Sequence, residues 1–363
     1  MHLRIPTCRA KFIPLALLWL TSFAGQQALY AIDGPVTVVV LGSSTAAGAN
    51  ATPLSESWVN KFAARIDSSH PGSQVTNLAV GGFTTFNVMP TGTIPPGTWN
   101  QPAYLPSSGH NITAALALDP DLIIVNLPTN DSDVLIPVDI QIANYAEIVA
   151  AAAAQDVPVW ITTSQPRNTS AAAQSLIRAM VDATNEAFAG RNLDFWTGLG
   201  DASGNILPAY NADGTHLNNA GHLLLYNRVM NTVTYDRPAG PFVAMQPRAR
   251  AVTEGDSVSF QVISYGSQPV TYQWQRNGVD IPGESMARLS MTVASLADSG
   301  AMFRCVITRD AAQVFSNEAQ LTVHALPDPA SALIDTDARK ESLAKWLPTQ
   351  SPKVCLCAHD PSE

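Results

Sequence analysis

The pattern of hydrophobic residues differs between the first and the second part of the chain. From about residue 36 to 235, short apolar runs rich in Val, Ile and Leu alternate with longer stretches whose apolar residues recur on one helical face. The short runs predict buried strands at 36–41, 74–80, 121–127, 158–163 and 193–197. The longer stretches predict helices around 58–66 and over 140–155, 170–189 and 218–234. Such alternation predicts a parallel sheet with helices on both faces.

A different pattern follows the stiff, Pro- and Gly-rich stretch 237–241. Apolar and polar residues now alternate over short runs, as in β-strands with one buried face. The spacing resembles an immunoglobulin-like β-sandwich, in which Trp274 takes the place of the core tryptophan and Phe303 that of the corner tyrosine. The cysteine expected on the opposite sheet falls at Val262, so the resemblance implies that Cys305 is a buried free thiol.

The N-terminus has the pattern of a secretory signal. Arg4, Arg9 and Lys11 precede an apolar run, 12–20, which small residues follow. We expect cleavage after Ala31 or after Ala24, and a secreted or periplasmic protein. The apolar run is too short for a stable membrane anchor, and no later stretch is longer, so no transmembrane segment is expected.

The resulting domain organisation has five parts. We expect a signal peptide (1–31), an α/β domain (32–236), a linker (237–241), an immunoglobulin-like domain (242–325) and a disordered tail (326–363) that holds Cys355 and Cys357. Because each of the two domains has a pattern able to form a core, we expect the α/β domain to fold alone. The net charge of −9 and the lack of a basic run exclude nucleic acid as a partner.

Polar residues that could take part in catalysis or ligand binding follow the predicted strands. The first strand ends at Gly42-Ser43-Ser44, and the second is followed by Gly82, where a backbone N–H can approach a ligand closely. The third precedes Asn130, whose amide can donate a hydrogen bond at the same sheet edge, where ligands of open α/β sheets bind.

The sequence Asp213-Gly214-Thr215-His216 precedes the last predicted helix. An Asp three residues before a His can reach one ring nitrogen and leave the other facing away. His222, on the helix itself, is expected to be structural.

Taken together, these blocks resemble the SGNH hydrolase family, also called GDSL esterases and lipases, over about residues 35 to 235. The resemblance implies a flavodoxin-like three-layer α/β/α fold. It makes Ser44 the nucleophile, His216 the general base and Asp213 its orienting acid. It also implies an oxyanion hole of the Ser44 and Gly82 N–H groups and the Asn130 side chain. Ser43 and Pro128 depart from the family pattern, and Ser43 is the alternative nucleophile.

The expected function is ester hydrolysis through an acyl-enzyme, with no cofactor and no metal. The expected substrate is a small-molecule or carbohydrate ester with a short acyl group, because the loop 83–109 is rich in Thr, Pro, Gly and Asn. Its residues Phe86, Met89, Trp99 and Tyr104 could stack on a sugar ring or close over a small acyl group. A lipase, a lysophospholipase or a thioesterase of the same family remains an alternative. So does a non-enzymatic surface or adhesion protein, since the second domain could contact polysaccharide or a cell surface.

Overall fold

A parallel five-stranded sheet forms the centre of the N-terminal region in this computed structural model, which describes residues 29–30, 34–127, 129–234, 237–238, 240–265 and 269–326. The strand order is β3-β2-β4-β5-β6, the doubly wound order of flavodoxin-like folds. The strands are β2 (Thr37–Gly42), β3 (Gln74–Asn77), β4 (Leu122–Asn126), β5 (Val159–Thr162) and β6 (Asn192–Leu193). The predicted fold class of this region is confirmed.

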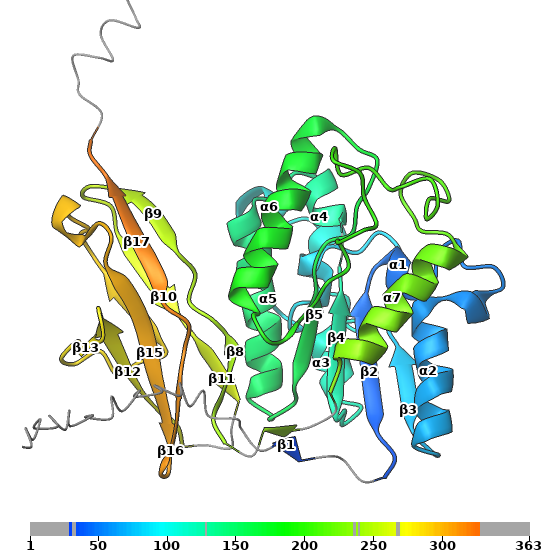
Figure 1. Cartoon of the computed structure of the whole chain (residues 1–363), viewed down its shortest axis with the longest axis horizontal. Helices are drawn as coiled ribbons and strands as arrows, with labels where there is room; N and C mark the ends of the chain where they lie inside the picture. The colour runs from blue at the N-terminus through cyan, green and yellow to red at the C-terminus, as the bar shows by residue number, and fades with distance from the viewer. Residues whose placement is uncertain are drawn as a thin grey trace, which may run out of the picture.

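Helices cover both faces of the sheet (Figure 1). On one face lie α2 (Trp58–Ser69) and α7 (Asn219–Thr232). On the other lie α3 (Ile112–Leu116), α5 (Val138–Ala153) and α6 (Ala171–Ala187). Two short helices, α1 (Ser44–Ala47) and α4 (Asn130–Asp133), begin just after β2 and β4. Short 3-10 turns lie at Leu54–Glu56, Thr85–Val88, Gly97–Trp99 and Pro102–Tyr104.

The strands β3 and β6 fall furthest short of their predicted lengths, and an Asx turn follows each of them. The strand expected over 74–80 stops at Asn77, whose side-chain oxygen accepts the N–H of Ala79 at 3.1 Å. The strand expected over 193–197 stops at Leu193, because Asp194 Oδ1 accepts the N–H groups of Trp196 and Thr197 at 2.9 Å. Backbone hydrogen bonds to β2 still continue past Asn77, since the N–H groups of Leu78 and Val80 donate to Val40 O and Gly42 O at 2.8 and 3.1 Å.

The C-terminal region is all β, which confirms the predicted immunoglobulin-like sandwich. A six-stranded sheet has the order β13-β12-β15-β17-β9, with β16 on β15, and β10 pairs with β14. These strands are β9 (Arg250–Thr253), β10 (Val258–Gln261), β12 (Thr271–Arg276), β13 (Val279–Asp280), β14 (Arg288–Met291), β15 (Met302–Arg309), β16 (Ala312–Phe315) and β17 (Ala319–His324). A 3-10 turn, Leu296–Asp298, precedes β15.

Aromatic residues fill the core of the sandwich. Trp274 is fully buried, and the Phe260 and Phe303 rings stack with centroids 4.7 Å apart. Cys305 is buried in the same cluster and, among the described residues, forms no disulfide, as predicted. Burial raises the pKa of its thiol to about 12, which makes the thiol unreactive.

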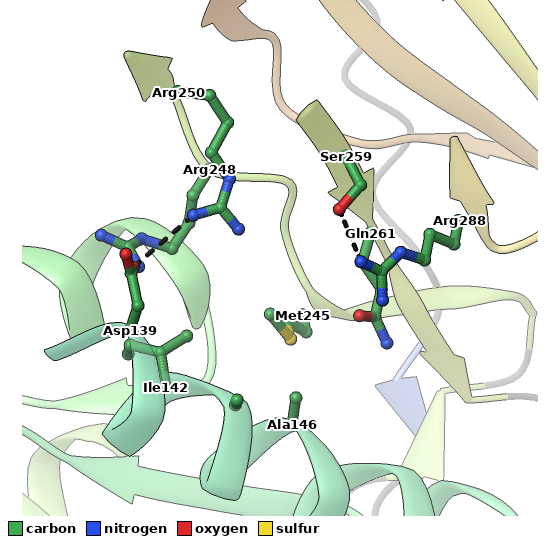
Figure 2. Close-up of a pocket in the computed structure, with 10 residues that line it drawn as sticks. Asp139, Ile142, Ala146, Met245, Arg248, Arg250, Ser259, Gln261 and Arg288 are labelled. Atoms are coloured by element: carbon green, nitrogen blue, oxygen red, sulfur yellow. Dashed lines mark hydrogen bonds and ion pairs between the residues drawn. The ribbon is translucent and has the colours of Figure 1, made fainter. Parts of the chain in front are cut away.

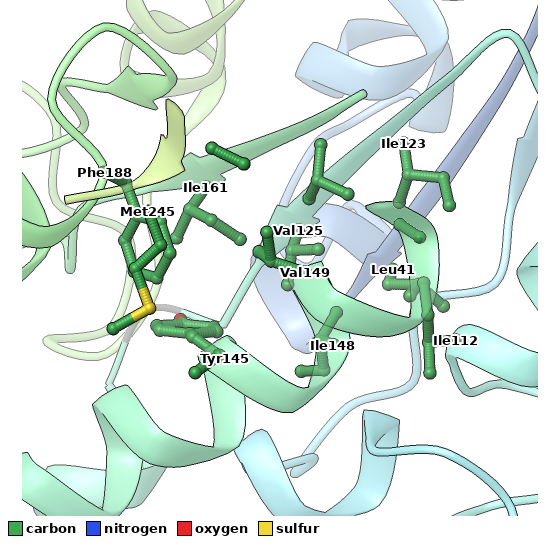
Figure 3. Close-up of a cluster of buried hydrophobic side chains, with 14 of the residues drawn as sticks. Leu41, Ile112, Ile123, Val125, Tyr145, Ile148, Val149, Ile161, Phe188 and Met245 are labelled. Carbon is green, nitrogen blue, oxygen red and sulfur yellow. The ribbon is translucent and has the colours of Figure 1, made fainter. Parts of the chain in front are cut away.

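Two strands of the C-terminal region pack directly on the α/β region. These are β8 (Phe242–Met245) and β11 (Ile263–Tyr265), which pair with each other and contact α5. Figure 3 shows Met245 among the side chains of Tyr145 and Phe188, in one continuous buried cluster. The α/β region therefore shares part of its core with β8 and β11, and its ability to fold alone stays a prediction.

Polar contacts reinforce this junction. The Tyr265 hydroxyl accepts the buried N–H of Val159 at 2.9 Å, and the N–H of Gln246 donates to Ala187 O at 2.7 Å. Arg248 forms ion pairs with Asp139 at 3.1 Å and Glu186 at 3.3 Å. A pocket of about 150 Å³ remains between α5 and the strands, with Met245 at its floor (Figure 2). The two regions are thus joined by backbone and side-chain contacts.

Most residues at the two ends of the chain lie outside the described ranges. Apart from Leu29–Tyr30 (β1), which pairs with Arg237–Pro238 (β7), the predicted signal peptide lies outside the described residues. The predicted tail, with Cys355 and Cys357, lies beyond residue 326 and is not described either. Within the described ranges, no helix is both long and apolar enough to cross a bilayer.

Candidate active site

Ser44 lies at the first position of α1, immediately after the strand β2. The turn between them requires a glycine, because a Cβ on Gly42 would lie 2.6 Å from Asn126 O and from Ala46 Cβ. A second glycine, Gly48, ends α1 in the left-handed conformation with φ of 88°. The short helix thus presents Ser44 at the carboxyl edge of the sheet.

A chain of hydrogen bonds joins Ser44, His216 and Asp213. Ser44 Oγ lies 3.0 Å from His216 Nε2, and His216 Nδ1 lies 2.8 Å from Asp213 Oδ2. The nucleophile, base and orienting acid expected from the sequence are therefore within hydrogen-bonding distance of one another, although 172 residues separate Ser44 from His216. This is the arrangement that activates a serine hydroxyl.

The Asp213 carboxylate is held by four donors. Oδ2 accepts His216 Nδ1 and, at 2.7 Å, Asn50 Nδ2, while Oδ1 accepts the backbone N–H groups of Thr215 and His216 at 2.9 and 2.8 Å. Partial burial alone would raise the pKa of Asp213, but these hydrogen bonds outweigh it and hold the pKa well below its usual range. Asp213 is therefore ionised and fixed in place beside the imidazole.

The neighbouring Ser43 forms no hydrogen bond with the histidine. Its side chain is buried, and its Oγ has no hydrogen-bond partner among the described residues. Its backbone N–H donates to Asn126 O at 3.0 Å, which fixes the turn. Of the two adjacent serines, it is Ser44 whose hydroxyl contacts His216.

Backbone donors lie next to Ser44. A Cβ on Gly81 would lie 3.8 Å from Ser44 Cβ, so the Gly81-Gly82 turn borders the nucleophile. Gly82 has φ of 85°, a conformation that favours glycine. Within the part of the chain that the structure describes, the N–H groups of Ser44 and Gly82 bond no acceptor. Both remain available for a ligand.

Asn130, the third expected oxyanion donor, begins α4. Its Nδ2 donates one hydrogen bond to Phe83 O at 2.9 Å, and its Oδ1 accepts from Arg167 at 3.3 Å. The amide nitrogen of Asn130 carries a second hydrogen, which does not bond to Phe83 O. The contact with Phe83 also ties the α4 turn to the loop that holds Gly82.

A buried carboxylate anchors the same loop. Asp131 accepts the N–H of Thr85 at 3.0 Å and its hydroxyl at 2.5 Å, and Asn144 Nδ2 donates to that hydroxyl at 2.8 Å. Burial raises the pKa of Asp131 to about 6, although the Thr85 hydrogen bonds act in the opposite direction. Asp131 therefore fixes the position of the loop rather than contacting the Ser44 hydroxyl.

The aromatic residues of the 83–109 loop pack against one another. Phe86 and Met89 are buried, and Trp99 and Tyr104 pack against Phe86 with ring centroids 6.0 and 6.1 Å away. Asn87 Nδ2 donates a hydrogen bond to Ala103 O at 2.9 Å, which holds the second half of the loop in place. Trp99 and Tyr104 are only partly buried, so the stacking of a sugar ring on this loop stays a prediction.

His222 has a structural role, as predicted. It is fully buried, its Nδ1 accepts the N–H of Trp58 at 3.4 Å and its Nε2 donates to Ala49 O at 3.0 Å. Burial lowers the pKa of the imidazole, which keeps it neutral. It thereby joins α7 to the start of α2 and to the segment after α1.

Asn50 and Arg167 were not expected from the sequence. Asn50 contacts Asp213 and has φ of 63°, a conformation that asparagine tolerates better than most residues. Arg167 follows β5 and contacts Asn130. The only sequence signal for Asn50 is its position two residues after Gly48. The sequence around Arg167 gives no such signal.

No group of three or more His, Cys, Asp or Glu side chains in the described ranges is arranged to hold a metal ion. The site consists of a serine, a histidine, an ionised carboxylate and unpaired N–H donors.

Solved structures resemble parts of this chain. A protein from Desulfitobacterium hafniense DCB-2, assigned to the lipolytic G-D-S-L family, is 15% identical with a TM-score of 0.40, over 55% of this chain and 99% of that one. The tandem Ig repeats of Dlar are 19% identical with a TM-score of 0.23, over 24% and 51%. The Titin M10-Obscurin like 1 Ig complex matches at 20% identity with a TM-score of 0.23, over 24% and 98%.

The model of one protein family matches residues 40–224, which is half of the chain and includes Ser44, Gly82, Asn130, Asp213 and His216. The chain belongs to the GDSL-like lipase/acylhydrolase family.

Proposed function

We propose that the protein is an exported carboxylic ester hydrolase that acts through an acyl-enzyme on Ser44. The observation that carries the proposal is the hydrogen-bond chain from Ser44 Oγ through His216 to Asp213, with distances of 3.0 and 2.8 Å. A serine hydroxyl is a weak nucleophile unless a base stands within this distance.

The reaction begins when Ser44 Oγ attacks the ester carbonyl carbon while His216 Nε2 takes the hydroxyl proton. The carbonyl oxygen becomes an oxyanion that accepts hydrogen bonds from the N–H groups of Ser44 and Gly82 and from Asn130 Nδ2. Asp213 stabilises the imidazolium formed on His216. The imidazolium then protonates the departing alkoxide, which leaves as the alcohol.

Water completes the cycle by the same route. His216 takes a proton from a water molecule, whose oxygen attacks the acyl carbon on Ser44, and the proton returns to Ser44 Oγ as the acid leaves. All bonds and protons balance without a cofactor.

The preferred substrate is a short acyl ester, such as an acetyl group on a carbohydrate. Support comes from the 83–109 loop, in which Phe86, Met89, Trp99 and Tyr104 pack against one another. The exposed large apolar side chains of the loop are Ile94 and Leu105, a small apolar surface for a long acyl chain. A pocket with so small an apolar surface gains little from additional methylenes.

Pre-steady-state hydrolysis of p-nitrophenyl acetate tests the proposal. The purified full-length protein should release a burst of nitrophenol stoichiometric with the enzyme, or turn over steadily if deacylation is fast, and Ser44→Ala should do neither. Release by the parent protein at no more than the rate in buffer would contradict the proposed function.

A further inference from the structure

Arg167 joins the loop after β5 to the turn that holds the oxyanion amide. One terminal nitrogen, Nη1, donates to Asn130 Oδ1 at 3.3 Å and lies 3.4 Å from Thr129 Oγ1. The other, Nη2, forms an ion pair with Asp133 at 3.0 Å. The arginine side chain is only 15% exposed, so the planar fork is largely shielded from water. It therefore contacts both ends of the short helix α4.

The guanidinium fixes which way the Asn130 amide faces. Arg167 has only donors, so it must meet the amide oxygen, and Phe83 O must meet the amide nitrogen at 2.9 Å. Because the amide oxygen faces Arg167 and the amide nitrogen faces Phe83 O, the second N–H of Asn130 can point in only one direction. A charged donor on the amide oxygen also polarises the amide and strengthens that N–H as a donor.

Other contacts hold Arg167 itself in place. Thr169 Oγ1 donates to the second oxygen of Asp133 at 2.8 Å, and Gln174 Nε2 donates to the backbone oxygen of Arg167. In the same loop, the N–H of Asn168 donates to Gly214 O at 2.8 Å, beside Asp213. One loop thus supports the amide on one side and the histidine turn on the other.

We propose that Arg167 is a positioning residue, which orients and polarises the Asn130 amide toward the oxyanion. The inference rests on the proposed function. It assigns to Arg167 an effect on turnover that passes through Asn130 alone. An ordinary surface ion pair with Asp133 would instead affect stability slightly and leave turnover unchanged.

A double-mutant cycle tests this. Arg167→Met should lower kcat about tenfold or more while KM changes less than about threefold, because the lost interaction acts in the transition state. Asn130→Ala should lower kcat by about 10²- to 10³-fold. Arg167→Met in the Asn130→Ala background should have almost no further effect, within about twofold.

Arg178→Met is the matched control, since Arg178 donates to Ala202 O and forms no hydrogen bond with Asn130. It should keep the parent kcat. Should Arg167→Met not fold, Arg167→Lys answers the same question, because an ammonium keeps the charge but loses the fork.

Two results would overturn the inference: an unchanged kcat in Arg167→Met, or an Arg167→Met effect of equal size with and without the Asn130 amide. Failure of the proposed function looks different, because the parent protein itself would then show no hydrolysis.

Discussion

Among single residues, Asp213 shows how local contacts prepare a group for its role. Four hydrogen bonds keep the carboxylate ionised and oriented, yet its side chain is 46% exposed. Water can therefore replace part of what the carboxylate does. Nothing nearby can replace the imidazole, which contacts Ser44 directly.

We accordingly expect His216→Ala to lose more activity than Asp213→Ala. His216→Ala should lower kcat by about 10⁴-fold or more, and Asp213→Ala by about 10²- to 10³-fold. Steady-state hydrolysis of p-nitrophenyl acetate at fixed pH measures both. A His216→Ala variant as active as the parent would remove the base from the mechanism.

Asp131 predicts a pH dependence of stability. Its pKa is about 6 in the folded protein and about 3.9 in an unfolded chain, so the folded state binds more protons between these values. The free energy of unfolding should therefore fall as pH rises through this window, by on the order of 3 kcal/mol, and level off above it.

Asp131→Asn removes this titration. Urea unfolding at pH 4 and pH 7 should show that the variant gains stability relative to the parent as pH rises. An identical pH profile in both proteins would show that Asp131 is ionised without cost.

The residues that could be predicted from the sequence are those next to a strand end or a helix start. Ser44, Gly82 and Asn130 each follow a strand, and Asp213 lies three residues before His216. Asn50 and Arg167 act through contacts with residues 163 and 37 positions away, which no local pattern reveals.

At the scale of elements, the hydrophobic periodicity predicted the main strands and helices but not where they end. Buried runs such as β4 have one structural solution in a doubly wound sheet. Asx turns of Asn77 and Asp194 follow β3 and β6, and the hydrophobic pattern does not encode such turns. The loop 83–109 has no period, and its internal packing depends on contacts between its own aromatic residues.

The packing of that loop predicts acyl specificity. The specificity constant for p-nitrophenyl esters should be greatest at acetyl or butyryl and fall steeply by octanoyl, because each methylene left in water forfeits about 0.8 kcal/mol of binding. A maximum at decanoyl or longer would contradict the short-acyl proposal and favour the lipase alternative.

At the scale of the whole molecule, the C-terminal sandwich is part of the hydrophobic core of the α/β region. In Figure 1, α5 and α6 lie between the central sheet and the sandwich. The strand patterns predicted both folds, but not that β8 and β11 pack on α5, because sequence periodicity does not say which buried faces meet.

A chain that ends at residue 236 should therefore be less stable than the full chain. Its thermal midpoint should fall by several degrees, since truncation uncovers the apolar face of α5 that Met245 and Tyr265 bury. Tyr265→Phe tests one contact: it leaves the Val159 N–H buried without a partner and should cost about 1–3 kcal/mol. An equal midpoint for the truncated and full chains would show that the α/β region is independent.

Active-site labelling tests whether Ser44 forms a covalent intermediate. A fluorophosphonate should modify the full-length protein once, with the adduct mapped by mass spectrometry to Ser44. Ser43→Ala should still be labelled and Ser44→Ala should not. An adduct on Ser43, or undiminished labelling of Ser44→Ala, would contradict the account.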